Sequence, residues 1–190
     1  MAGSLQNATT LEVQGIIGHQ LYDALTHENN IALLKLKTKL KFDQSTRRII
    51  LSDSQPPIGT VCRASGWDCT GIASPQEHFP NHLRSADLPI ADCSDCTGSG
   101  KSEMKPIIPK GTVCAGNVQK EKLICHGDIG GPFHCRLNDG RRFLRGIMIY
   151  EVNIPGELVC PVTFTSIAHH LEWIRFHTRD TVSKTRLTAG

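Results

Sequence analysis

The chain has 190 residues, of which 39% are hydrophobic and 21% charged, and a formal net charge of +3. That length suits one domain, and the composition is ordinary for a globular protein. A charge of +3 is too small to indicate nucleic-acid binding. No apolar run reaches the length of a membrane span, and the amino terminus lacks the apolar core of a signal peptide.

The predicted elements are short strands separated by turns. Runs of β-branched and apolar residues predict strands at 11–17, 31–36, 60–65, 112–115 and 143–149. Clusters of Gly, Pro, Asp and Ser lie at 52–57, 74–80, 94–100 and 138–140. Regularly spaced short strands of this kind predict an all-β barrel or sandwich.

One helix is predicted near the end of the chain. Ser166 is a suitable N-cap residue for it. The side chains that follow recur at helical spacing along one stripe: Ile167, Leu171 and Ile174, continued by His177, with Trp173 beside it.

The eight cysteines favour disulfides over a metal site. Cys93 and Cys96 form the only CxxC pair, and no other ligand-type residues stand near it at zinc-finger spacing. We therefore expect no metal and no cofactor. Asn7-Ala8-Thr9 is a weak N-glycosylation signal, because such tripeptides are common by chance.

A lysine-rich stretch, KLKTKLKF, leaves two interpretations open. On a strand, side chains two residues apart share one face. Such a face would suit a sulfated glycan or phosphate, or it would be a solvated face that discourages edge pairing, which we favour. The residues concerned are Lys35, Lys37, Lys39 and Lys41.

Several stretches, in matching order and at matching spacing, resemble the chymotrypsin-like serine proteases, most closely those of tissue-kallikrein or snake-venom-kallikrein type. They are ENNIALLKL (28–36), GTVCRASGW (59–67), SPQEHFP (74–80), GTVCAG (111–116), CHGDIGGPFHC (125–135), LRGIMIY (144–150), PVTFTSI (161–167) and LEWI (171–174). The resemblance implies an all-β, chymotrypsin-like double β-barrel that is incomplete. It also implies a secreted protein, although this chain shows no signal peptide.

The resemblance also divides the chain. A partial peptidase domain is expected over 1–176, followed by a tail at 179–190. Within it we expect a first-barrel remnant at about 1–55, the second barrel at about 56–165 and a closing helix at about 166–178. The part of the family domain that holds the activation peptide and the catalytic histidine is not matched. A truncated or alternative product is therefore expected.

The disulfide pairing is implied by the resemblance alone. The implied bridges are Cys62–Cys135, Cys96–Cys114 and Cys125–Cys160. Cys69 and Cys93 match no family partners, which leaves them as a candidate pair with each other.

The catalytic positions implied by the resemblance are degenerate. The nucleophilic serine of the family corresponds to Ile129, and its carboxylate to Asn30. An isoleucine has no lone pair with which to attack a carbonyl, and an amide holds the histidine in the wrong tautomer. The remaining histidines favour surface or packed roles: His19, His134, His169, His170 and His177. We expect no peptidase activity by the family mechanism.

The specificity pocket is also altered. Its floor corresponds to Leu123, and Val162 replaces a glycine of its wall. The strand that pairs with substrate reads Ile149-Tyr150-Glu151, with Glu151 again in place of a glycine. A leucine floor would accept an apolar side chain, but the bulk on the walls favours a filled pocket.

The oxyanion turn keeps its backbone at Gly127, Asp128 and Ile129. This turn would either retain oxyanion donors or persist because it suits the fold, which we favour. In active relatives the aspartate pairs with a freed ammonium group. Without one, we expect Asp128 to swing to solvent or to pair with a histidine or with backbone donors.

The sequence thus predicts a non-catalytic serine protease homologue that binds protein partners or protease inhibitors. Two alternatives stay open: a kallikrein-like serine endopeptidase, and a truncated product without an independent role. Neither nucleic acid nor membrane is expected as a partner.

Overall fold

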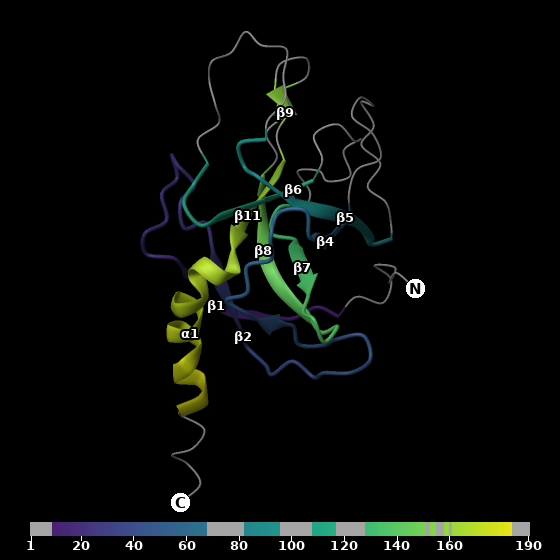
Figure 1. Ribbon diagram of the computed structural model, residues 1–190. Helices are drawn as coiled ribbons and strands as arrows, with labels where there is room; N and C mark the ends of the chain where they lie inside the picture. Colours follow the sequence, from purple (N-terminus) through teal and green to yellow (C-terminus); the bar gives the residue numbers. More distant parts are fainter. Residues whose placement is uncertain are drawn as a thin grey trace, which may run out of the picture.

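The computed structural model describes residues 9–67, 82–95, 108–116, 128–150, 153–154, 158–159 and 161–183. Its main feature is a sheet that closes on itself (Figure 1). The strands follow the order β11-β6-β5-β4-β7-β8, and a further β11–β8 pairing completes the ring. The predicted all-β barrel is therefore confirmed.

The barrel strands are β4 (Val61–Gly66), β5 (Arg84–Ala91), β6 (Thr112–Ala115), β7 (Pro132–Arg136), β8 (Arg142–Tyr150) and β11 (Val162–Ser166). The short strand β3 (Ile50–Leu51) runs parallel to β8 at the edge of the same sheet. Two small sheets stand apart: β1 (Val13–Gly18) with β2 (Ala32–Leu36), and β9 (Asn153–Ile154) with β10 (Leu158–Val159). One helix, α1 (Ile167–Ser183), follows β11.

Each of the five strands predicted from the sequence is present, with bounds that differ by at most two residues. The strand at 84–91 was not predicted, because Asp87 and Pro89 belong to residue types that are depleted in strands. The structure accommodates Pro89 opposite Val61, and its carbonyl accepts a hydrogen bond from Gly116 N–H (2.8 Å).

The barrel encloses the hydrophobic core. Phe133 on β7 and Phe164 on β11 are fully buried, and their rings stack with centroids 4.4 Å apart. The Cys62–Cys135 disulfide joins β4 to β7 next to this pair, as the resemblance implied. The barrel is thus fixed by ring packing and by a covalent link between neighbouring strands.

The second disulfide corrects the predicted pairing. Cys114 is bonded to Cys93, so both the Cys96–Cys114 bridge and the candidate Cys69–Cys93 pair are wrong. The reason is the register of β5 and β6, in which Ala91 lies opposite Cys114. The chain just after β5 therefore brings Cys93 within 5.1 Å of Cys114, Cα to Cα, which suits a disulfide.

Helix α1 begins as predicted. The hydroxyl oxygen of Ser166 accepts a hydrogen bond from His169 N–H (3.4 Å), which is an N-cap contact. The predicted stripe of Ile167, Leu171 and Ile174 is buried. The helix continues to Ser183, beyond the predicted end at about residue 178. Within the described residues, no helix is long and apolar enough to span a membrane.

The β1–β2 hairpin differs from the barrel strands in exposure. Ile16 lies opposite Leu34, and the two side chains are 71% and 60% exposed. Figure 1 shows the hairpin beside α1 and outside the barrel. The hairpin falls in the segment expected as the first-barrel remnant, and its outward face has no strand against it among the described residues.

Candidate functional site

The turn before β7 is built around two glycines. Gly130 has a positive φ of 87°, and its N–H donates to the carbonyl of Met148 (2.9 Å). The N–H of Gly131 donates to Asp128 O (2.8 Å), and a Cβ on Gly131 would lie 2.7 Å from that same oxygen. The turn therefore needs glycine at both positions and presents Ile129, which is 52% exposed, at its tip.

The carboxylate of Asp128 is held beneath this turn. Its Oδ1 accepts a hydrogen bond from the backbone N–H of Trp67 (2.7 Å), and the residue is only 9% exposed. A Cβ on Gly66 would lie 2.1 Å from the Asp128 Cγ, so only glycine leaves room for the carboxylate there. Of the expected alternatives, pairing with a backbone donor is confirmed, and the outward swing is wrong.

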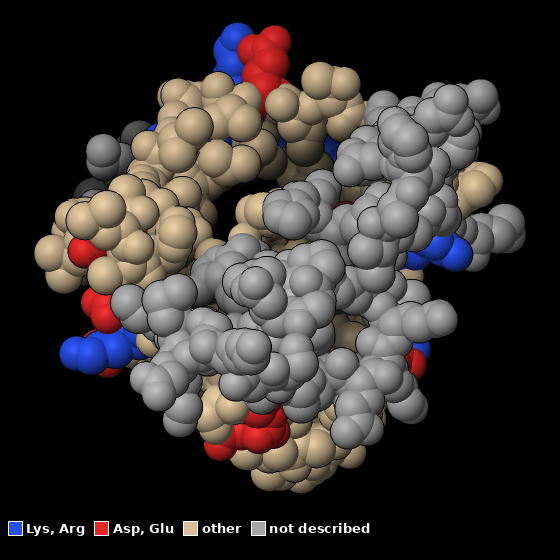
Figure 2. Space-filling view, turned by 90° about the horizontal axis from the view of Figure 1, so that it is seen from above, with Lys and Arg blue, Asp and Glu red and all other residues tan. Residues whose placement is uncertain are grey.

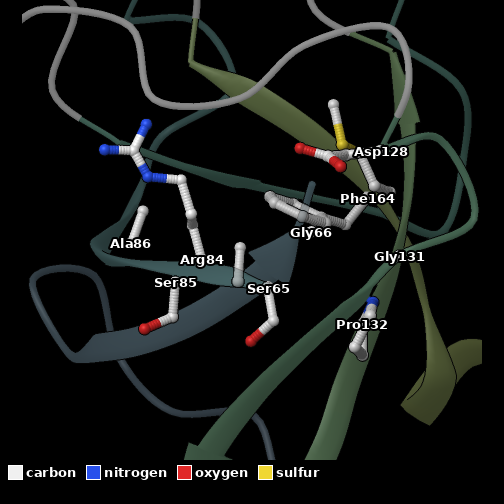
Figure 3. Close-up of a pocket in the computed structure, with 11 residues that line it drawn as sticks. Ser65, Gly66, Arg84, Ser85, Ala86, Asp128, Gly131, Pro132 and Phe164 are labelled. Carbon is white, nitrogen blue, oxygen red and sulfur yellow. The ribbon is translucent and has the colours of Figure 1, made fainter. Parts of the chain in front are cut away.

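A cavity of about 120 Å³ opens next to Asp128. Figure 3 shows Asp128 on one side of it and the Arg84 side chain on the other. Its remaining walls are mostly small or apolar, and include Ala64, Ala86 and Phe164. The cavity is therefore a small space between β4, β5 and the turn, with opposite charges on two sides.

Asn30, the expected carboxylate position, is anchored through its backbone. Its carbonyl accepts a hydrogen bond from the buried hydroxyl of Thr165 on β11 (2.9 Å). This bond ties the end of the β1–β2 loop to the barrel. An amide side chain is neutral, so Asn30 offers no negative charge to stabilise an imidazolium.

Two of the expected pocket residues are described, and both belong to the interior. Ile149 and Val162 are 5% and 8% exposed, and Val162 pairs with Ala115 on β6. The filled pocket wall stays a prediction, because the expected floor residue Leu123 and Glu151 lie outside the described residues. Tyr150 ends β8, and its side chain lies outside the described part.

The expected histidines divide into two groups. His134 is on β7, opposite Arg63 on β4, and burial and the nearby guanidinium of Arg142 lower its pKa. The others gather where α1 meets the β1–β2 loop: His19, His169, His170 and His177. His170 is buried, with Nδ1 2.9 Å from Ser166 O and Nε2 3.3 Å from Asn29 Oδ1. His134 and His170 are packed against neighbouring residues, one of the two roles predicted for the histidines.

The lysine-rich stretch does not form one strand face. Strand β2 ends at Leu36, so only Lys35 of the four lysines is within it. Lys37 follows the strand and forms an exposed ion pair with Glu12 (2.6 Å). Figure 2 shows one face of the molecule, on which basic and acidic side chains lie in small separate groups.

Several expected site residues lie outside the described residues: Asn7, Cys69, Cys96, Gly127, Leu123, Cys125, Glu151 and Cys160. Sequence reasoning missed Gly66 and Trp67 as partners of Asp128. The signal for them was the SGW within GTVCRASGW, but nothing local indicates that this strand end meets a turn more than sixty residues later. No group of three or more metal-ligating side chains is present in the described part of the chain.

Comparisons with known proteins find similarity to trypsin-like serine proteases. A family model described as Trypsin matches residues 2–174. Human Kallikrein-14 is 32% identical over 173 residues, covering 90% of this chain and 60% of that protein. Snake venom serine proteinase 4a of Crotalus adamanteus is 30% identical over 148 residues, covering 78% of this chain and 54% of that protein.

A solved structure of a serine protease is also similar to this chain. Neuropsin, a serine protease expressed in the limbic system of mouse brain, is similar with a TM-score of 0.71 at 29% identity. The match covers 88% of this chain and 71% of that structure. The chain spans about 60% of the length of the human kallikreins that it matches.

Proposed function

Because the chain belongs to the trypsin family of serine proteases, we propose that it is a non-catalytic member that binds other proteins. Its fold is the chymotrypsin-like one, incomplete relative to neuropsin, with a closed six-stranded barrel and the closing helix. Family membership by itself favours a peptidase, so the case for a non-catalytic role depends on the residues at the site.

The observation that carries the proposal is the side chain at the tip of the turn. The family resemblance gives the nucleophile position to Ile129, and this side chain projects 52% exposed from the turn between Asp128 and Gly130. An aliphatic side chain has neither a proton for a base to remove nor a lone pair for attack. Loss of a triad nucleophile costs about 10⁶ in turnover in a related type of site.

The carboxylate position supports the same conclusion. A buried carboxylate holds the catalytic imidazole in the correct tautomer and stabilises its charged form. Asn30 supplies an amide instead, and its loop is fixed by the Thr165 hydrogen bond to its carbonyl. An amide at this position costs roughly 10⁴ even where the rest of the triad is intact.

A binding role requires a rigid surface, and the turn supplies one. Its backbone is fixed by the hydrogen bonds of Gly130 and Gly131 and by the Asp128–Trp67 bond below it. Ile129 makes the tip apolar, which suits a protein partner or a protease inhibitor more than a charged ligand. The disulfides favour an extracellular or similarly oxidising compartment for this role.

The test is active-site labelling combined with a binding assay. We expect no labelling of the purified chain by a serine-directed phosphonate and no hydrolysis of peptide amide or ester substrates. An Ile129→Ser variant restores a hydroxyl on the same turn but keeps Asn30, so it tests the nucleophile position alone. Stoichiometric labelling of the natural chain would establish the endopeptidase alternative instead.

Binding is measured on the same preparation. We expect protein inhibitors of trypsin-like proteases to be retained by the immobilised chain, and Ile129→Asp to weaken that retention. A well-folded chain that retains no such inhibitor would contradict the decoy role while leaving the catalytic result intact.

A further inference from the structure

The contact between α1 and the β1–β2 loop is made largely by histidines and one tryptophan. We call this contact the histidine joint and define it by His19 on the loop and His170, Trp173 and His177 on α1. The ring of His19 meets His170 edge-on with centroids 5.6 Å apart and lies 5.0 Å from Trp173. Trp173 in turn lies 4.7 Å from His177. Figure 1 shows α1 and the hairpin side by side at this place.

Polar contacts across the joint link the hairpin to the helix. The indole N–H of Trp173 donates to Gln20 Oε1 (2.9 Å), and His170 Nε2 lies 3.3 Å from Asn29 Oδ1. The amide nitrogen of Asn29 donates to Leu21 O (2.9 Å), which fixes the amide with its oxygen toward His170. The loop therefore meets α1 at both ends, and the Trp173–Gln20 hydrogen bond is the one that forms while the rings are neutral.

His170 is the innermost ring of the joint, 3% exposed. Its Nδ1 lies 2.9 Å from Ser166 O, a carbonyl that can only accept, so this nitrogen carries the proton in the neutral ring. A second proton on Nε2 would find the Asn29 oxygen at 3.3 Å, which is a weak bond. The free energy gained from that weak bond is small compared with the free-energy cost of charging a buried ring.

The charged groups near the joint are mostly positive. On α1, Glu172 and Arg175 are exposed, and His169 has its ring 4.9 Å from His170 and lies over Gly111, beside the exposed Lys110. From β8, the buried Arg145 guanidinium donates to Ser166 Oγ (2.8 Å). The third element against α1, β3, contributes only the apolar Ile50 and Leu51.

The loop itself carries the carboxylates of Asp23 and Glu28, and neither is among the charges that act on the pKa of His19 or His170. The Asp23 carboxylate accepts hydrogen bonds from the backbone N–H groups of Leu25 and Thr26, and His27 is the charge that acts on its pKa. Glu28 lies in the same loop and takes part in the turn through its backbone, accepting from Asp23 N–H. Among the described residues, the charges that act on the pKa of His19 and His170 are those of other histidines.

We propose that the histidine joint is a pH-sensitive latch that holds the β1–β2 hairpin against α1 while its rings are neutral and releases it when they are protonated. The rings of the joint lie about 5 Å apart, and the charges that act on His19 and His170 are those of other histidines, so each added proton repels the next. The barrel, which closes without the hairpin, keeps its structure during this release.

The sign of the pH dependence follows from two directions. Burial, together with the charges of His177 and His169, lowers the pKa of His19. Burial also lowers the pKa of His170, as do the charges of His169 and His19, against the opposing hydrogen bond to Ser166. A folded-state pKa below the free value of 6.5 means that the released state binds protons more strongly. The latch is therefore fully closed above the free value and opens as pH falls through the lower, folded-state values.

The test is hydrogen exchange of the full chain at about pH 7.5 and about pH 5. Protection of the β1 and β2 amides, corrected for intrinsic exchange, is compared with that of β7 and β8. We expect hairpin protection to fall at least about tenfold at the lower pH, and barrel protection to stay constant. His19→Gln should retain most of the hairpin protection, whereas His134→Gln, a matched change in the barrel, should lose it as the natural chain does.

A second measurement, the fluorescence of Trp173, tests the proposal even if a histidine variant fails to fold. Trp67→Phe leaves Trp173 as the only tryptophan, and its emission should titrate as pH falls below the free histidine value of 6.5. His177→Gln, a change on the half-exposed side of the joint, should shift that titration. Hairpin protection that is unchanged at the lower pH, or lost equally in His19→Gln, would overturn the proposal.

Discussion

The barrel and the β1–β2 hairpin are built from similar strands but are held in different ways. In the barrel, Phe133 and Phe164 are fully buried and stacked. In the hairpin, Ile16 and Leu34 also face each other across a strand pair, yet they are 71% and 60% exposed. The difference shows that an apolar strand pattern specifies a strand, whereas burial depends on the neighbouring strands.

Closure of the sheet explains this contrast. The β11–β8 pairing removes the free edges of the barrel and encloses one side of every strand. The hairpin has no such closure among the described residues, so side-chain contacts with α1 and β11 hold it in place. Mutations should therefore act strongly in the barrel and weakly on the outer face of the hairpin.

The largest expected effect comes from the stacked ring pair. Phe133→Ala should lower the free energy of unfolding by about 3–5 kcal/mol, because it leaves a cavity in a closed core. Ile16→Ala is the matched control on the hairpin and should change it by less than about 0.5 kcal/mol. Urea unfolding followed by circular dichroism measures both. Equal effects would contradict the division between the two regions.

The disulfides should contribute nearly as much, and they test the corrected pairing. Removing the Cys62–Cys135 bridge, which closes a separation of 73 residues, should cost about 4 kcal/mol. Removing Cys93–Cys114, with a separation of 21, should cost about 3 kcal/mol. Paired cysteine-to-alanine variants in urea unfolding check both values. Peptide mapping of the oxidised chain should recover Cys93, and not Cys96, linked to Cys114.

The sequence was sufficient for the barrel but not for its finer connections. Each predicted strand is present, because β-branched and apolar runs bounded by turn residues report local conformation directly. The choice between Cys93 and Cys96 was beyond such reasoning, since both lie within reach along the chain. The register that places Ala91 opposite Cys114 decides it, and register is a property of the paired strands.

The site shows the same limit. The glycine turn around Ile129 was predicted from the GDIGGP phrase, and its fixed backbone is present. The partner of Asp128 was not, because Trp67 is remote in sequence and contributes a backbone N–H, which every non-proline residue has. Only the folded arrangement shows why Gly66 cannot carry a side chain.

Gly66→Ala tests that arrangement and should have an intermediate effect. The new Cβ would fall 2.1 Å from the Asp128 carboxylate, which must then leave its bond to Trp67. We expect a loss of about 1–3 kcal/mol in the free energy of unfolding. Gly15→Ala, where the hairpin offers open space, should have little effect. In a double-mutant cycle, Asp128→Ala should remove most of the penalty of Gly66→Ala, and additive losses would contradict the contact.

The smallest effect is expected where the two regions meet. Thr165 is 3% exposed on β11, and its hydroxyl donates to the carbonyl of Asn30, two residues before β2 begins. Thr165→Val keeps the shape of the side chain and removes its hydroxyl donor. The Asn30 carbonyl must then accept its hydrogen bond from water. A typical net hydrogen bond contributes about 0.5–1.5 kcal/mol, so the free energy of unfolding should fall by about 1 kcal/mol.

Hydrogen exchange should show this loss unevenly, with a larger loss of protection in β2 than in β7 or β8. Thr178→Val is the matched control, because that hydroxyl donates to Ile174 O within α1. If Thr165→Val weakened the barrel amides as much as those of β2, the hairpin and barrel would unfold as one unit, and the distinction between them would be wrong.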